Sequence, residues 1–311
     1  MTFHEQSLLI LRVLNFVTCC FVLCSLQPAL AQATDQEISR CGLTRTYQHL
    51  IEAEDASAHF SKLIGGSEAV AGSWPWQIRL GIRAPNRQIM WMCGGSILSD
   101  IYIITAAHCL EPGLNMPYVV RIGEHSANRV DDGAEDIPVL RARIHEKYNK
   151  LANYLNDIAI LRLSRPIKFR ENVLPVCLPS ANDDPPAGTS CFVTGWGNTG
   201  PGKPPFSSVL KEGKVRVIGR GICQSPFFWG SGVRNTNICA GYPEGQTDAC
   251  RGDSGGPLVC QHPNGKQWVL QGLVSFGWSQ GCGFPGKPAV YTRVSHYLSW
   301  IEKTTGSTIT S

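Results

Sequence analysis

Short apolar stretches, separated by glycine, proline, asparagine and aspartate, recur along the chain from residue 74 onward. Many short strands with turn residues between them are typical of an all-β sandwich or barrel. A helical period stands out only at the end, where apolar residues within Tyr297–Ile301 precede Gly306. We expect strands over Trp76–Leu80, Ser96–Leu98, Ile101–Ile104, Tyr118–Ile122, Ile158–Leu163, Cys191–Thr194, Lys214–Ile218, Pro257–Cys260, Trp268–Val274 and Ala289–Val294.

The first 31 residues differ from this pattern. Ser7–Leu26 is mostly apolar, and an Ala-x-Ala sequence follows at Ala29–Ala31. This combination predicts a secretory signal peptide (1–31) that is cleaved off. A retained signal-anchor helix is the alternative, because about twenty apolar residues can span a bilayer. Residues 32–62 are polar and without sustained period, which is typical of a propeptide or linker, so the folded domain is expected over 63–311.

Composition narrows the classes of function. The chain has 311 residues and a formal net charge of +4 without a long basic run, which argues against a nucleic-acid partner. Three of its 13 cysteines, Cys19, Cys20 and Cys24, lie in the apolar amino-terminal segment, and ten remain. An even number of cysteines in an exported chain favours five disulfides. The spacings are wide and no Cys-x-x-Cys pair exists, so we reject a zinc site.

The glycine-rich stretch Thr247–Pro257 has residues suited to nucleophilic catalysis. A serine hydroxyl needs a base to take its proton and fixed donors for the oxyanion that it generates, and the N–H groups of Gly252 and Ser254 can converge in such a turn. A plain glycine-rich surface turn is the alternative. The stretch also fits the Gly-x-Ser-x-Gly elbow of α/β-hydrolases, but a strand rather than a helix follows it, and only His262 and His296 lie downstream.

Two further motifs supply a base and an acid. His108 stands at the end of an apolar stretch and beside a cysteine, and Asp157 stands at the start of another. Each motif alone is weak, because a histidine at a strand end is usually structural and an Asn-Asp pair is usually a turn. Together with Ser254 they provide base, orienting acid and nucleophile in the chain order His, Asp, Ser, and we take the three as candidate catalytic residues.

From Leu63 to Ile301 the chain resembles the secreted serine endopeptidases of the trypsin/chymotrypsin family. The motifs that carry the resemblance follow the family's order and approximate spacing: Leu-Ile-Gly-Gly, Trp-Pro-Trp-Gln, Cys-Gly-Gly-Ser, Thr-Ala-Ala-His-Cys, Asn-Asp-Ile-Ala-Ile-Leu, Gly-Trp-Gly-Asn-Thr and Gly-Asp-Ser-Gly-Gly-Pro. The resemblance implies an all-β fold of two six-stranded antiparallel β-barrels, about 63–171 and 172–296, followed by a C-terminal helix. It also implies hydrolysis of peptide bonds through an acyl-enzyme.

The resemblance implies a role for each matching residue. His108 is expected to act as the base, Asp157 to hold its tautomer, and Ser254 to attack the substrate. The N–H groups of Gly252 and Ser254 would form the oxyanion hole. Ser275, which we also assign to substrate binding, matches the family serine that hydrogen-bonds the triad aspartate.

Specificity and activation follow from the same resemblance. Asp248 matches the aspartate at the base of the trypsin-type pocket, which pairs with a substrate Lys or Arg. Gly277 matches a glycine of the pocket wall, whereas Ala289 replaces the second wall glycine and disfavours the bulkier guanidinium. Ala249 replaces a serine that in many trypsins helps to bind Lys. The preference between Lys and Arg therefore stays open.

Activation is expected to follow cleavage after Lys62. The new amino terminus at Leu63 would insert and pair with Asp253, which orders the oxyanion hole and the pocket in the family. A buried carboxylate without its partner costs about 3–5 kcal/mol, enough to keep the uncleaved form inactive. The chain would thus be made as a zymogen and need an activating protease.

The remaining expectations concern disulfides, cofactors and partners. The implied disulfides are Cys93–Cys109, Cys191–Cys260, Cys223–Cys239, Cys250–Cys282 and Cys41–Cys177, the last tethering the cleaved propeptide. We expect no cofactor, because the acidic residues of the family's calcium loop are poorly spaced for that ion: Glu124, Asp131, Asp132, Glu135 and Asp136. Expected partners are protein substrates and protein inhibitors. A silent homologue acting as a binding module and a membrane-anchored protease are the alternatives, and cascade and digestive roles both stay open.

Overall fold

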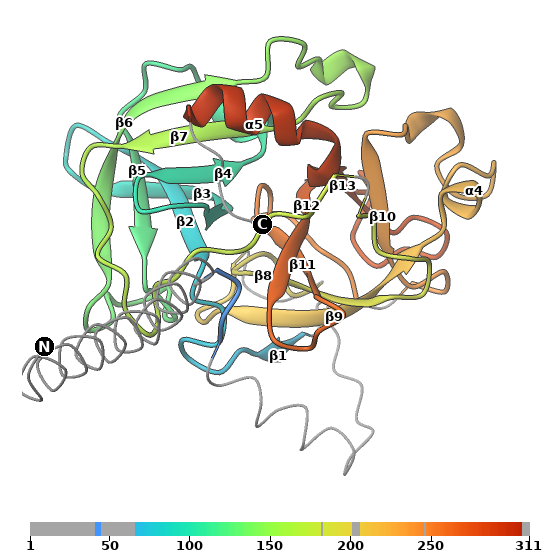
Figure 1. Cartoon of the computed structure of the whole chain (residues 1–311), viewed down its shortest axis with the longest axis horizontal. Helices are drawn as coiled ribbons and strands as arrows, with labels where there is room; N and C mark the ends of the chain where they lie inside the picture. Colours follow the sequence, from blue (N-terminus) through green and yellow to red (C-terminus); the bar gives the residue numbers. More distant parts are fainter. Residues whose placement is uncertain (1–40, 45–65, 182, 201–205, 246, 307–311) are drawn as a thin grey trace, which may run out of the picture. The chain divides into compact units, whose positions relative to one another are not determined.

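A computed structural model describes residues 41–44, 66–181, 183–200, 206–245 and 247–306. Two antiparallel β-barrels make up this part of the chain (Figure 1). The first is closed in the order β2-β3-β4-β7-β6-β5. Its strands are β2 (Gln77–Arg83), β3 (Ile89–Ile97), β4 (Tyr102–Thr105), β5 (Tyr118–Ile122), β6 (Glu135–Ile144) and β7 (Ala159–Leu163).

The second barrel is built from the carboxyl-terminal half of the chain. Its strands follow the order β9-β10-β13-β12-β11-β8, a pairing of β8 with β9 closes the ring, and the short β1 (Ser67–Glu68) extends it along β9. The strands are β8 (Ser190–Gly195), β9 (Lys211–Ile218), β10 (Asn237–Gly241), β11 (Pro257–Gln261), β12 (Trp268–Phe276) and β13 (Ala289–Arg293). The expected fold, two six-stranded barrels and a C-terminal helix, is confirmed.

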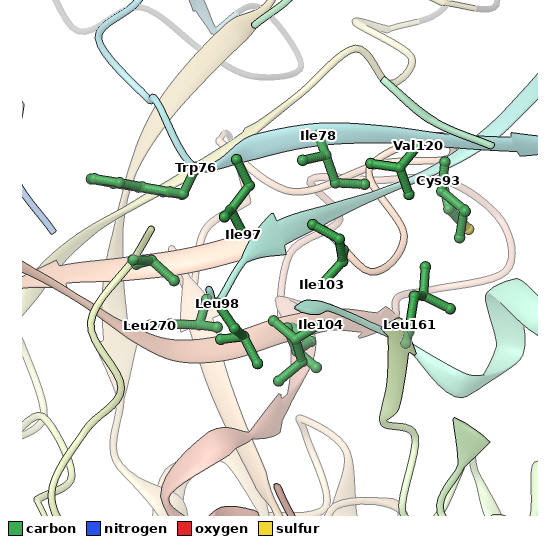
Figure 2. Packing of buried hydrophobic residues seen from close by; sticks show 14 of the residues in the cluster. Trp76, Ile78, Cys93, Ile97, Leu98, Ile103, Ile104, Val120, Leu161 and Leu270 are labelled. Atoms are coloured by element: carbon green, nitrogen blue, oxygen red, sulfur yellow. The ribbon is translucent and has the colours of Figure 1, made fainter. Parts of the chain in front are cut away.

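The barrels share a hydrophobic core. Alternate apolar side chains of the first barrel's strands, such as Ile78, Ile103 and Leu161, are fully buried. Figure 2 shows them packed together with Trp76 and with Leu270, which belongs to β12 of the second barrel. Because side chains from both barrels belong to one cluster, packing fixes the position of one barrel against the other.

Helical elements are short. The C-terminal helix α5 (Leu298–Thr305) ends at Gly306, whose φ of 72° is the left-handed value that a glycine adopts readily. Tyr297 belongs to a preceding 3-10 turn rather than to this helix. The other short elements are α4 (Arg220–Cys223), η1 (Ala107–Leu110), η2 (Lys150–Ala152), η3 (Gly230–Gly232) and η4 (Val294–Tyr297).

Three strands, β1, β6 and β10, were not predicted from the sequence. β6 contains Pro138 and several charged residues, and Ile137 is its one fully buried side chain, so the apolar alternation is weak. Glu135 and Asp136, which we expected in an acidic loop, are the first residues of this strand. The other two missed strands are short: β10 has five residues, among them one alanine and one glycine, and β1 has two.

Disulfides join the described cysteines in five pairs, and these are the pairs that the resemblance implies. They are Cys41–Cys177, Cys93–Cys109, Cys191–Cys260, Cys223–Cys239 and Cys250–Cys282. Cys41 is 136 positions from its partner, so this bond attaches the start of the described chain to the barrels.

Several sequence predictions lie outside the described residues. These are the signal peptide over 1–31, nearly all of the propeptide over 32–62, and the cleavage site between Lys62 and Leu63. Within the described ranges, no helix has both the length and the apolar character that a membrane span requires.

Candidate active site

Asp157 is the centre of the site. It lies two positions before β7, its side chain is fully buried, and it accepts hydrogen bonds from both barrels. The His108 backbone N–H donates to Oδ1 (2.9 Å) and the His108 ring Nδ1 lies 2.8 Å from Oδ2. From the second barrel, the Ser275 hydroxyl donates to Oδ2 (2.6 Å), and Thr292 Oγ1 donates to the Asp157 carbonyl (2.7 Å). These contacts fix the carboxylate in one orientation.

His108 is held by the turn that follows β4. His108 belongs to the 3-10 turn η1. Its backbone N–H and its ring Nδ1 both hydrogen-bond the Asp157 carboxylate. Burial disfavours the charged imidazolium, but the charge of Asp157 and the hydrogen bond to it outweigh that effect, so the pKa of His108 is raised above its ordinary value. A ring with Nδ1 bonded in this way leaves Nε2 as the nitrogen that can accept a proton.

Ser254 lies beside the segment that carries His108. Its carbonyl accepts from the Gly94 N–H of β3 at 2.8 Å, and a Cβ added to Gly255 would collide with Thr105 and approach Ala106. Among the described residues, no hydrogen bond joins the His108 ring to the Ser254 hydroxyl. Such bonds are often long in a free enzyme and shorten only when substrate binds.

The backbone around the serine leaves two donors free. Gly252 has a φ of 101°, and the Phe206 ring and the backbone of Gly197 stand where a Cβ would be, so only glycine fits. Within the described part of the chain, neither the Gly252 nor the Ser254 N–H donates a hydrogen bond to protein. Two unused donors beside a serine are what an oxyanion requires.

Asp253 points away from the serine into the second barrel. Its carboxylate is buried and accepts from the backbone N–H groups of Gly197 (2.8 Å) and Cys250 (2.9 Å). A Cβ at Gly195 or Gly197 would collide with this carboxylate. Burial raises the pKa of Asp253 to about 6, and no cationic side chain of the described residues pairs with it.

Asp248 is the second buried carboxylate near the serine. It is 2% exposed and accepts from the N–H groups of Gly283 (2.8 Å) and Ala289 (2.9 Å). Burial raises the pKa of Asp248 to about 7, although these backbone donors oppose the shift. A carboxylate in this environment gains most from a cation that reaches it, because only hydrogen bonds now compensate its charge.

The other predicted pocket residues fall into two groups. Ala249, Ser275 and Ala289 are buried, and Ala289 bonds Asp248 through its backbone. Gly277 is exposed, and a Cβ there would meet no atom within 4 Å. Gly277 therefore borders open space, whereas the methyl group of Ala289 lies within the packed interior.

Arginines contact most of the carboxylates that we expected in an acidic loop, and the absence of calcium there stays a prediction. Arg121 forms ion pairs with Glu124 (3.0 Å) and Asp136 (2.6 Å), and Glu135 pairs with Arg165 and Arg170. Calcium needs six to eight oxygen ligands, and guanidinium groups already compensate these carboxylates. The single three-residue cluster of metal-ligand types in the described chain joins His108 to Cys93 and Cys109, whose sulfurs are bonded to each other.

Sequence reasoning did not find two features of the site. Thr292 fixes the Asp157 backbone, yet nothing near it in the sequence distinguishes it from any strand threonine. Gly195 and Gly197 provide room for the Asp253 carboxylate. Their Gly-Trp-Gly spacing contributed to the family resemblance, but it did not by itself suggest a carboxylate 56 residues away.

Comparison with known proteins adds two findings. Residues 63–301 match the sequence model of the family described as Trypsin. Chymotrypsin-C of Mus musculus is 37% identical over 246 residues, an alignment that covers 78% of this chain and 88% of the relative.

Proposed function

Because the chain belongs to the trypsin family of serine peptidases, we propose that it hydrolyses peptide bonds after Lys or Arg with His108, Asp157 and Ser254 as its triad. The observation that carries the proposal is the fixed orientation of the Asp157 carboxylate. Its bond to His108 Nδ1 leaves Nε2 as the ring nitrogen that can accept a proton, and the Gly94 N–H of the same barrel holds the Ser254 carbonyl.

The reaction proceeds in two halves. In the first, His108 takes the proton of the Ser254 hydroxyl as its oxygen attacks the scissile carbonyl, and then gives that proton to the leaving amine. In the second, the same ring deprotonates a water, which attacks the acyl-enzyme and releases the free carboxylic acid. Asp157 stabilises the imidazolium in both halves, and the Gly252 and Ser254 N–H groups stabilise each oxyanion.

Asp248 supports cleavage after basic residues. A buried carboxylate with no cation beside it favours a substrate side chain that brings one. Mouse chymotrypsin-C is by name a chymotrypsin, so membership of the family does not decide the specificity, and the argument depends on Asp248. The Ala289 methyl group reduces the space beside this carboxylate. The preference between Lys and Arg stays open.

Activation by cleavage after Lys62 is supported by Asp253. This carboxylate is buried, has a raised pKa and has no described cation beside it. The α-ammonium group of a new amino terminus at Leu63 would provide the missing charge and release a penalty of about 3–5 kcal/mol. The Cys41–Cys177 bond would keep the cleaved propeptide attached.

Secretion and the absence of a metal cofactor belong to the same proposal. Five disulfides favour an oxidising compartment, which agrees with a signal peptide over 1–31. The ion pairs of Arg121 with Glu124 and Asp136, and of Arg170 with Glu135, support the expectation that no calcium binds there. A secreted zymogen of this kind implies two kinds of partner, an activating protease and protein inhibitors.

The decisive experiment compares the activated chain with its Ser254→Ala variant. Both proteins are cut after Lys62 and assayed on a peptide library in which the residue before the scissile bond is varied through all amino acids. We expect the wild type to cleave after Lys and Arg and the variant to be inactive with an unchanged unfolding temperature. Cleavage after Phe or Leu would overturn the role of Asp248, and an active Ser254→Ala protein would overturn the triad.

A further inference from the structure

The outer surface of the first barrel has a hollow of about 430 Å³ beside α5. β4, β6 and β7 form its floor, and α5 packs next to them (Figure 1). Three of its lining residues are the exposed arginines Arg141 and Arg143 of β6 and Arg162 of β7. We call this feature the arginine hollow; it is completed by Tyr102, Leu140, Ile160 and Thr304.

The three arginines stand together without compensation. Arg141 and Arg162 are direct partners in the antiparallel register of β6 and β7. Like charges directly opposite each other destabilise a sheet. No acidic residue lines the hollow, and no carboxylate of the described residues forms an ion pair with any of the three. The clustered arginines therefore contribute no ion pair that would stabilise the fold of the described residues.

Other arginines of the same barrel are treated differently. Arg121 pairs with Asp136, and Arg165 and Arg170 pair with Glu135. All three lie within or next to β5, β6 and β7, so the barrel does pair its arginines where an acid is at hand. Single exposed arginines without a described ion pair also occur elsewhere, such as Arg216 and Arg234. The arginine hollow differs because three of them lie together on two neighbouring strands, an arrangement that suits an external anion.

The geometry suits an extended anion with several charged groups. Arg141 and Arg143 are two positions apart on one strand, about 7 Å, and Arg162 is on the neighbouring strand, about 5 Å away. Guanidinium groups bind oxyanions through two parallel hydrogen bonds. The exposed Leu140 and the ring of Tyr102 also line the hollow and offer apolar surface. Sugar rings have apolar faces, and sulfate groups on them repeat at comparable spacing.

We propose that the arginine hollow binds a sulfated polysaccharide. The five disulfides argue for an oxidising, extracellular setting, where sulfated glycans are abundant polyanions and nucleic acids are not. None of the residues that line the hollow belongs to the catalytic site, so binding there leaves the active site open. Such an interaction would hold the protein on a glycan-rich matrix and goes beyond the proposed peptidase activity.

Binding of a heparin oligosaccharide to the full chain tests the proposal by calorimetry. To prevent self-digestion, every protein carries Ser254→Ala. The test variant adds Arg141→Ala, Arg143→Ala and Arg162→Ala, and the control adds Arg216→Ala, Arg220→Ala and Arg234→Ala, three exposed arginines elsewhere. Each surface charge contact contributes a factor of roughly two to five, so the test variant should bind about ten- to hundredfold more weakly. The control, with the same net charge, should bind within about twofold of the parent.

Three further readouts discriminate between outcomes. The oligosaccharide should raise the unfolding temperature of the parent and the control but not of the test variant. Affinity should fall with salt with a logarithmic slope of about three, one ion released per arginine. The desulfated oligosaccharide should not bind. Equal loss in test and control variants, equal binding of the desulfated sugar, or preference for polyglutamate would overturn the proposal. None of these measurements requires catalysis, so they do not depend on the peptidase assignment.

Discussion

Protonation of Asp248 should control the binding of basic ligands. The carboxylate is buried, and its pKa is raised from 3.8 to about 7. A cation binds the charged form, so the protein must release a proton wherever Asp248 is still protonated. The apparent affinity for an aromatic amidinium such as benzamidine should therefore fall as pH falls through 7. The loss should be about tenfold at pH 6 and about a hundredfold at pH 5, or about 1.4 kcal/mol per unit.

Calorimetry on the activated Ser254→Ala protein measures this directly. Titrations at pH 7 in two buffers of different ionisation enthalpy should reveal release of about half a proton per ligand bound, since Asp248 is half protonated at that pH. At pH 8.5 the release should be close to zero. The series from pH 5 to pH 8.5 then gives the pKa of the free protein from the affinity alone.

The Asp248→Asn variant is the matched control. It keeps an oxygen acceptor for the backbone donors of Gly283 and Ala289, and it keeps His108, whose pKa is raised above its ordinary value by Asp157. Any pH dependence that remains in the variant belongs to other groups and can be subtracted. An affinity of the parent that stays constant between pH 5 and pH 8, without proton release, would refute the buried cation-binding carboxylate.

Three further predictions address activation, the triad and the fold. Lys62→Gln should leave a folded chain that trypsin treatment does not activate; hydrolysis by the uncut variant would contradict the zymogen. Ser275→Ala removes a charge-assisted bond of 2.6 Å to Asp157. Its loss should cost about 1.5–3 kcal/mol, so kcat should fall about 10- to 100-fold with KM little changed; an unaltered kcat would show that the bond is dispensable. Replacing Cys93 and Cys109 by alanine opens a link between residues 16 positions apart and should cost about 3 kcal/mol in denaturant unfolding, whereas an unchanged midpoint would argue against the loop-entropy account.

Short apolar stretches made most of the barrel strands predictable. Tyr118–Ile122 is both the expected and the observed range of β5, and four of its five residues are buried. β6 was not predicted because this ten-residue strand fully buries only Ile137, and because proline, here Pro138, is rare within strands. Its exposed arginines, which have no place in an apolar pattern, are the residues from which the polysaccharide site is inferred.

The site was predictable to the extent that its chemistry lies in short motifs. His108, Asp157 and Ser254 each stand in a recognisable sequence, and Asp157 bonds His108. Thr292 was not predictable, since its bond to the Asp157 carbonyl joins residues 135 positions apart and any strand threonine could make it. Sequence alone also could not say that Asp253 would lie between two glycine backbones, because only close packing makes a Cβ impossible there.

The proposed catalysis depends on the contact between the two barrels as much as on any one residue. The first barrel contributes Asp157 and His108, but Ser275 and Thr292 of the second hold Asp157 in place. In return, the Gly94 N–H of the first barrel holds the Ser254 carbonyl of the second. A relative shift of 1 Å would break bonds on both sides, and misplacement on that scale can cost about a hundredfold in rate. The shared core around Trp76 and Leu270 therefore belongs to the catalytic apparatus, although neither side chain hydrogen-bonds any of the triad residues.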